Sequence, residues 1–250
     1  MERATVACLR VDLYTILDQS RAIAVGLDYL RHLGIDWSPH PTNEEARREY
    51  ERIWSQLGSR TIESLIELPL MSDPDSLATL DVLIKIGAPA VYTDPNLLAL
   101  VVCRAVNLSL ELGNCDASCS AYVWLSLVAG PRFGDYRADV YRFGQLGYDL
   151  VEGRGLTRFQ ARTYMEFGYG VVPWTRHLRA GRDVVRRAFE AANRMGDLTY
   201  AAYCGDQLNT NLLAAGVRLP RPNAKPTGAS RLRRRCGAGL SWTPSPPSSG

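Results

Sequence analysis

Apolar residues recur at spacings of three or four along most of the chain, which is the period of an α-helix with one buried face. The clearest stretch contains Leu178, Gly181, Val185, Ala188, Ala192 and Met195. It predicts an amphipathic helix of about five turns. Residues 136–150 repeat the pattern, and residues 96–112 are apolar nearly all round, which predicts a buried central helix. No useful stretch alternates with the period of two that an exposed strand has, so we expect an all-α fold.

Glycines follow the predicted helix ends at similar distances. Gly113, Gly153 and Gly196 lie 40 and 43 residues apart, and Gly34 lies close to two further periods upstream. Glycine just after a helix is typical of a left-handed cap, because other side chains meet a steric penalty there. A new helix that opens with small and aromatic residues is predicted after three of these stops, at 117–122, 159–164 and 200–203.

A repeat of about 40 residues, each unit a pair of antiparallel helices, predicts an α-solenoid. The tetratricopeptide fold is the nearest common form, although these helices are longer. The competing interpretation is an irregular helical bundle whose glycines fall at similar distances by chance. Prolines break the pattern at 38–42, and residues 69–74 and 88–95 are predicted connectors. Thr42 or Asn43 is expected to cap the following helix, and Asp94 to precede another.

The character of the sequence changes after Gly216. Residues 217–250 contain six of the chain's 14 prolines, seven basic residues and no acidic residue, and the apolar periodicity is lost. We therefore expect a helical-repeat domain over residues 1–216 and a disordered basic tail over residues 217–250. The arginines at 231–235 suit an anionic membrane or a nucleic acid, but a solvated basic stretch explains them equally well.

Composition and charge are those of a folded soluble protein. The 250 residues are 46% hydrophobic and 22% charged, and the net charge of +3 leaves residues 1–216 at −4 once the tail is set aside. A mildly acidic body is not typical of a nucleic-acid-binding domain. No apolar run reaches the roughly 20 residues of a membrane span, and the N-terminus lacks a signal-peptide pattern. We expect a cytoplasmic protein with reduced cysteines.

A search for catalytic motifs finds no convincing one. The sequence has no Gly-Lys pair, which a phosphate-binding P-loop requires, and Phe-Gly-Asp at 133–135 has the residue types of a kinase metal-binding motif in the wrong order. Cys103, Cys115 and Cys119 can in principle hold a metal, but small buried residues between packed helices are the favoured interpretation. The sequence therefore predicts no catalytic residue, no cofactor and no metal.

Several segments carry a resemblance to a known family, namely residues 94–119, 130–136, 148–162, 196–203 and 209–216. They are similar to the helical middle region of very large bacterial signalling proteins. Those proteins join a serine/threonine-kinase-like domain, an AAA-type ATP-binding domain, a tetratricopeptide-like region, a GAF sensor and a histidine kinase. The other four portions have no counterpart in these 250 residues, and the resemblance stops where the composition changes. A truncated or frame-shifted gene product is the hypothesis that this suggests.

The resemblance implies a non-catalytic scaffold or coupling segment of a multidomain signal-transduction kinase, in contact with protein partners or neighbouring signalling domains. The alternatives are ATP-dependent phosphotransfer by a parent sensor histidine kinase or serine/threonine kinase, a free-standing scaffold for a response regulator, and a non-functional remnant. Candidate anchors for a partner are Tyr122, Trp124, Tyr164, Trp174 and Tyr203, although each also suits core packing. Uncapped apolar positions at 9–17 and 208–213 predict self-association.

Overall fold

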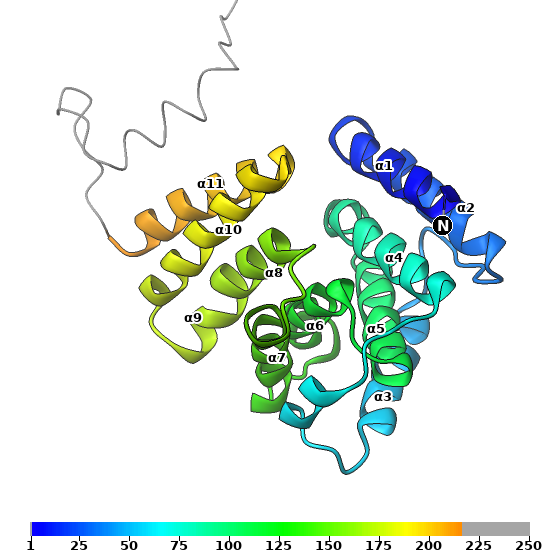
Figure 1. Cartoon of the computed structure of the whole chain (residues 1–250), viewed down its shortest axis with the longest axis horizontal. Coiled ribbons are helices and arrows are strands. Elements are labelled where there is room, and N and C mark those ends of the chain that lie inside the picture. Colours follow the sequence, from blue (N-terminus) through cyan, green and yellow to red (C-terminus); the bar gives the residue numbers. More distant parts are fainter. Residues whose placement is uncertain (1, 217–250) are drawn as a thin grey trace, which may run out of the picture.

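The computed structural model describes residues 2–216, and helices make up most of them (Figure 1). The N-terminal half contains α1 (Glu2–Leu17), α2 (Gln19–His32), α3 (Asn43–Leu57), the 3-10 turn η1 (Glu63–Glu67), α4 (Pro74–Thr93) and α5 (Pro95–Leu112). The C-terminal half contains α6 (Asp116–Phe133), α7 (Ala138–Arg154), α8 (Gln160–Glu166), the π-helical turn η2 (Phe167–Val171), α9 (Val172–Thr175), the 3-10 turn η3 (Leu178–Ala180), α10 (Gly181–Met195) and α11 (Leu198–Ala214). The predicted all-α class is confirmed for the described residues, and the predicted tail at 217–250 lies outside them.

The helices pack in succession from one end of the molecule to the other (Figure 1). α1 and α2 pack together at one end, α4 contacts both, and α5, α6 and α7 follow in chain order. α8 then packs on α10, and α10 on α11 at the opposite end. A row of direct contacts joins α1 to α4, α4 to α6, α6 to α8 and α8 to α11. Side chains from helices far apart in sequence therefore meet along this row.

Helix α5 is the buried central helix that the sequence predicts. Leu97, Val101 and Ala105 on it are buried, and α5 packs against α3, α4 and α6. It is also long and apolar enough to cross a membrane by length and composition alone, but 67% of that window is buried inside the protein. Burial of this kind is typical of the core helix of a globular domain.

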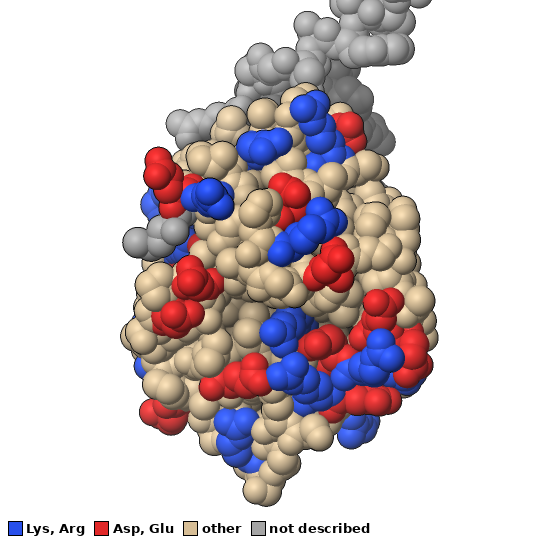
Figure 2. All heavy atoms as spheres, turned by 90° about the vertical axis from the view of Figure 1, so that its right-hand side faces the viewer, with Lys and Arg blue, Asp and Glu red and all other residues tan. Residues whose placement is uncertain are grey.

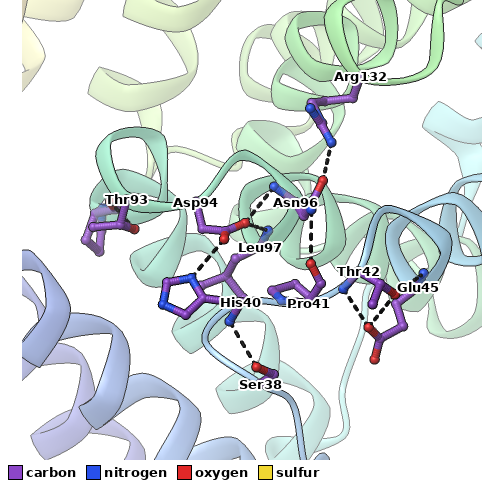
Figure 3. Close-up of polar contacts among 11 residues, drawn as sticks. Ser38, His40, Pro41, Thr42, Glu45, Thr93, Asp94, Asn96, Leu97 and Arg132 are labelled. Carbon is purple, nitrogen blue, oxygen red and sulfur yellow. Dashed lines mark hydrogen bonds and ion pairs between the residues drawn. The ribbon is translucent and has the colours of Figure 1, made fainter.

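The loop before α3 is tied to the start of α5 (Figure 3). Asp94 caps α5 by accepting hydrogen bonds from backbone N–H groups of its first turn, and its other carboxylate oxygen lies 2.9 Å from Nδ1 of His40. Thr42 caps α3: its hydroxyl accepts from the Glu45 N–H, while the Glu45 carboxylate accepts from the Thr42 N–H. The cap predicted at Thr42 or Asn43 is Thr42, and the helix start predicted after Asp94 is confirmed, with Asp94 itself as the cap.

Three of the predicted glycine stops are confirmed. Gly34, Gly113 and Gly196 each follow a helix and have φ angles of 81°, 105° and 72°. The stop predicted at Gly153 is wrong, because α7 continues through Arg154. The guanidinium of Arg154 donates to the backbone carbonyls of residues 66 and 68, which favours one more helical residue, and Gly155 provides the left-handed cap with a φ of 70°.

The predicted connector at 88–95 is also wrong, since most of it belongs to α4. The helix runs through Pro89 to Thr93, although a proline inside a helix removes one hydrogen bond and costs about 3 kcal/mol. Ile86 and Ala90 are fully buried on either side of Pro89. Burial of an isoleucine side chain contributes roughly 1.5–3 kcal/mol, so the packing of this turn offsets the lost hydrogen bond.

The helix expected from Leu178 begins three residues later. Leu178–Ala180 form the 3-10 turn η3, and α10 starts at Gly181. A Cβ atom on Gly181 would lie 1.9 Å from the carbonyl oxygen of Gly168. The start of α10 therefore lies directly against the backbone of η2, a contact that only glycine permits at this position.

Charged side chains are interleaved on the face that Figure 2 presents, which is the right-hand side of Figure 1. Lysine and arginine lie next to aspartate and glutamate over this face. Among the exposed ion pairs of the described residues, Arg52 of α3 pairs with Glu111 of α5, and Arg31 pairs with Asp36 at 3.0 Å. Exposed ion pairs of this kind each contribute about 0–1 kcal/mol to the free energy of unfolding, so they add little to the stability of the fold.

Candidate functional site

The structure places the predicted anchor residues in different environments, and Tyr122 belongs to the core. Its ring is fully buried in α6 and lies 5.9 Å from the ring of Phe143 in α7, centroid to centroid. Its hydroxyl donates to Oδ1 of Asn114 at 3.0 Å, so the one polar atom of the side chain is satisfied internally. Tyr122 therefore has no surface to offer to a partner.

Tyr164 of α8 is also buried and ties three helices together. Its hydroxyl donates to the carboxylate of Glu152 in α7, and the guanidinium of Arg187 in α10 lies 4.6 Å from the ring centroid. Burial, reinforced by the hydrogen bond to Glu152, raises the pKa of Tyr164 to about 12. The phenol thus stays protonated at neutral pH and acts as a structural donor.

Trp174 is 65% exposed and lies in a separate surface cluster. Its indole stacks on Tyr141 of α7, with ring centroids 5.8 Å apart, and Tyr136 lies 6.4 Å away. These rings contact one another at the surface, and none of them lines the cavity in which the remaining two predicted anchors lie.

Trp124 and Tyr203 do come together, in a cavity of about 110 Å³. The cavity lies between α4, α6, α11 and the segment formed by α8 and η2. Its walls include Tyr92, Trp124, Tyr169, Tyr200, Tyr203 and Asp206. The rings of Tyr200 and Tyr203 lie 5.5 Å apart and nearly perpendicular, at 73°, so they form two adjoining walls. We call this hollow the aromatic cavity.

Sequence reasoning missed Tyr92, Tyr169, Tyr200 and Asp206. Tyr92 was placed in a connector, whereas the helix through Pro89 carries it to the cavity. Tyr169 lies between two glycines, in a segment for which no element is predicted above. A signal was present only for Tyr200, which opens the same small and aromatic segment as Tyr203.

The π-helical turn η2 is what places Tyr169 on the cavity wall. A π-turn inserts extra backbone into a helix and turns the following side chains relative to the preceding ones. Gly168 in this turn has no room for a side chain, because a Cβ atom there would lie 2.8 Å from Val185 and 2.9 Å from the carbonyl of Gly181. Close packing of α10 against η2 therefore holds the widened turn in place.

Buried charged groups lie behind the cavity wall. The carboxylate of Glu166 in α8 has no exposure to solvent, and it accepts hydrogen bonds from the Ser120 hydroxyl at 2.9 Å and from the Tyr200 hydroxyl at 3.1 Å. The guanidinium of Arg162, also buried, lies 4.4 Å from the Tyr200 ring centroid and 3.8 Å from the Asp197 carboxylate. We call these five residues the Glu166 network.

The Glu166 network is continued across the molecule by Asp12 of α1. Its carboxylate lies 3.4 Å from Nη2 of Arg162 and also pairs with Nζ of Lys85 in α4. Burial lowers the pKa of Lys85, and the nearby charge of Arg162 lowers it further, against the opposing effect of Asp12. Polar contacts thus connect α1, α4, α6, α8 and α11, the same helices that form the row of contacts described above.

Glu166 is the group in this network that titrates near neutrality. Burial raises its pKa to about 7, although the Ser120 hydroxyl and the Arg162 charge both favour the ionised form. Strongly shifted carboxyl groups occur both at functional sites and in structural networks. Here the identified partners of Glu166 are side chains of the protein itself. The protonation state of Glu166 therefore acts directly on the packing of α6, α8 and α11.

A larger hollow of about 690 Å³ lies between α1, α2 and the loop at 39–40. Several of its charged and titratable walls have partners within the protein: Arg31 pairs with Asp28 and Asp36, the Arg21 guanidinium lies over the ring of Tyr14, and His40 pairs with Asp94 (Figure 3). These pairs hold loops and helix ends. The aromatic cavity differs because five aromatic side chains, those of Tyr92, Trp124, Tyr169, Tyr200 and Tyr203, line one small space, and we take it as the candidate site.

Among residues 2–216, no group of three or more His, Cys, Asp or Glu side chains is arranged to hold a metal ion. Cys115 and Cys119 are buried, and burial raises the pKa of the Cys115 thiol, so it remains protonated. Comparisons with protein-family models, with curated proteins and with solved structures give no match for this chain.

Proposed function

We propose that the protein is a non-catalytic helical scaffold that binds a segment of a partner protein along α4, α6, α8 and α11. The observation that carries this proposal is the aromatic cavity between these helices. Tryptophan and tyrosine are enriched among the residues that contribute most to protein–protein binding, because they bury a large area at little cost in conformational entropy. A cavity with aromatic walls gives one side chain of a partner a defined position.

In this proposal the helices form an α-solenoid of antiparallel pairs, similar to the tetratricopeptide fold. The direct contacts from α4 to α6, α6 to α8 and α8 to α11 support it, since equivalent helices of neighbouring units touch in such folds. Solenoids present long surfaces to their ligands. The resemblance to the helical region of signalling kinases adds the context: a cytoplasmic segment that couples an ATP-binding module to a sensor module.

Selection of peptides tests the proposal without a known partner. The full 250-residue chain is used to select from a displayed peptide library, and selected peptides are measured by calorimetry against the wild type, Tyr92→Ala and Tyr136→Ala. Tyr92 is 63% exposed at the cavity, and Tyr136 is 57% exposed in the separate surface cluster, so the two variants remove matched rings. We expect Tyr92→Ala to weaken binding at least tenfold and Tyr136→Ala to leave it unchanged. A failure to select any peptide, or equal binding by the three proteins, would contradict the proposal.

A second calorimetric titration separates the scaffold from the phosphotransfer alternative. We expect the chain to give no binding heat with MgATP, because it lacks a P-loop sequence and none of the described residues that line the aromatic cavity is basic. Magnesium-dependent binding of ATP would replace the scaffold with ATP-dependent phosphotransfer as the proposed function.

A further inference from the structure

The walls of the aromatic cavity are suited to a particular chemical group. The rings of Tyr200 and Tyr203 are nearly perpendicular, and Tyr92, Trp124 and Tyr169 also line this partly open cavity. The face of an aromatic ring is electron-rich, so several rings around one space attract a cation, whereas an apolar side chain gains only from burial. A volume of about 110 Å³ has room for a head group of a few heavy atoms rather than for a nucleotide or a cofactor.

The hydroxyl of Tyr200 strengthens this preference. It donates to the buried Glu166 carboxylate at 3.1 Å, and a phenol that donates to a carboxylate gains electron density in its ring. Arg162 already lies 4.4 Å from the Tyr200 ring centroid, which shows that the ring accepts a cation on its face. Arg162 is not among the residues that line the cavity.

The charges around the cavity favour a positively charged ligand. Among the described residues that line it, Asp206 is the charged one, and it lies on α11 three residues after Tyr203. The surrounding network contains two basic side chains, Arg162 and Lys85, and three acidic ones, Asp12, Asp197 and Glu166. With Asp206 included, the region is net acidic even when Glu166 is protonated.

We propose that the aromatic cavity binds the ammonium or trimethylammonium head group of a lysine side chain in the partner segment. This inference rests on the proposed function, and it names the anchor residue of the partner. The rings hold the cation by their faces, and the Asp206 carboxylate supplies the opposite charge. Free small-molecule ammonium compounds share this chemistry, and the experiment below separates them from a protein-borne lysine.

The test measures, by NMR titration, the affinity of the full chain for three defined probes. One probe is a short peptide with a central trimethyllysine, the second is the same peptide with the neutral tert-butyl isostere, and the third is choline. We expect the trimethyllysine peptide to bind at least tenfold more tightly than the neutral isostere. Equal affinity of the two peptides would overturn the inference, because a cavity that recognises only size does not distinguish them. Choline binding as tightly as the trimethyllysine peptide would overturn the assignment to a protein segment.

Two pairs of variants complete the test. Asp206→Asn is expected to weaken binding of the trimethyllysine peptide several-fold and to leave binding of the neutral isostere unchanged. Tyr92→Ala is expected to weaken binding of both peptides. The matched controls, Asp183→Asn on α10 and Tyr136→Ala, are expected to bind as the wild type does. The result is independent of the peptide selection described above. Selected peptides with an apolar anchor and no lysine would leave the scaffold standing and overturn this inference alone.

Discussion

Glu166 is an acidic side chain without solvent exposure, held between Ser120 of α6 and Tyr200 of α11. Its pKa of about 7 lies above the ordinary value of 4.5 because burial penalises the charged form. A carboxyl group with a raised pKa binds its proton more tightly in the folded state. The stability that it contributes is therefore present below about pH 4.5 and is lost as the pH rises through about 7.

The first prediction follows from this sign. Between pH 5 and pH 8 the wild type is expected to lose roughly 2–3 kcal/mol of unfolding free energy through Glu166, since each pKa unit corresponds to about 1.4 kcal/mol. Glu166→Gln keeps one of the two acceptor oxygens, and its amide N–H can donate to the other hydroxyl, but it cannot titrate, so it is expected to abolish this slope. Urea unfolding at several pH values measures it. Glu190→Gln, at an exposed position of α10, is the control and should keep the wild-type slope; an unchanged slope in Glu166→Gln would assign the pH dependence elsewhere.

The anchor residues show how far single positions can be predicted. Trp124 and Tyr203 line the cavity, whereas Tyr122 and Tyr164 do not. All four lie near predicted helix starts that are rich in small and aromatic residues. The difference lies in which direction each side chain leaves its helix. That direction depends on how the helix is rotated against its neighbours, and local sequence does not specify this rotation.

At the scale of elements, short signals at helix ends were reliable. Thr42 and Asp94 cap their helices as their side-chain chemistry predicts, and Gly113 and Gly196 end theirs. Such signals act within one turn of the chain, so neighbouring residues suffice to interpret them. The largest error was at Pro89, where buried neighbours offset the cost of the proline in the helix; the end of α7 and the start of α10 were misplaced by a few residues.

The contact between η2 and α10 gives the second prediction. Gly181→Ala would place a Cβ atom 1.9 Å from the Gly168 carbonyl oxygen, so backbone must shift, and we expect a loss of about 1–3 kcal/mol in unfolding free energy. Gly205→Ala in α11 is the matched control. No atom lies within 4 Å of its added Cβ, and alanine favours a helix over glycine by roughly 0.5–1 kcal/mol. The two substitutions should thus shift the thermal midpoint in opposite directions; a shift of the same sign in both would show that the close approach is not limiting.

At the scale of the whole molecule, α1 presents an exposed apolar stripe. Val6, Leu9, Leu13 and Ile16 recur at helical spacing on one face, and each is at least half exposed. The opposite face of α1, with Ala4, Ala7 and Val11, packs into the protein. A large exposed apolar stripe is typical of an interaction surface, and this gives a location to the self-association that the sequence predicts.

The third prediction concerns that stripe. We expect the wild type to associate with rising concentration in light scattering after size-exclusion chromatography. Leu9→Lys combined with Leu13→Lys should return the protein to a monomer, because two charges on the stripe disfavour its burial. Leu70→Lys, at an exposed position in the loop before α4, is the control and should associate as the wild type does. A single monomer peak for the wild type at all concentrations would contradict the prediction.

The sequence by itself determined the all-α class, the central helix at 96–112 and most helix starts and stops, because helical periodicity and caps are local properties of the chain. The tertiary structure decided which tyrosines line a cavity and which fill the core, and that α4 continues past Pro89. It also brought Glu166, Arg162 and Asp12 together from helices up to about 150 residues apart. These outcomes depend on burial and on contacts between distant helices, and those free energies exist only once the helices are packed.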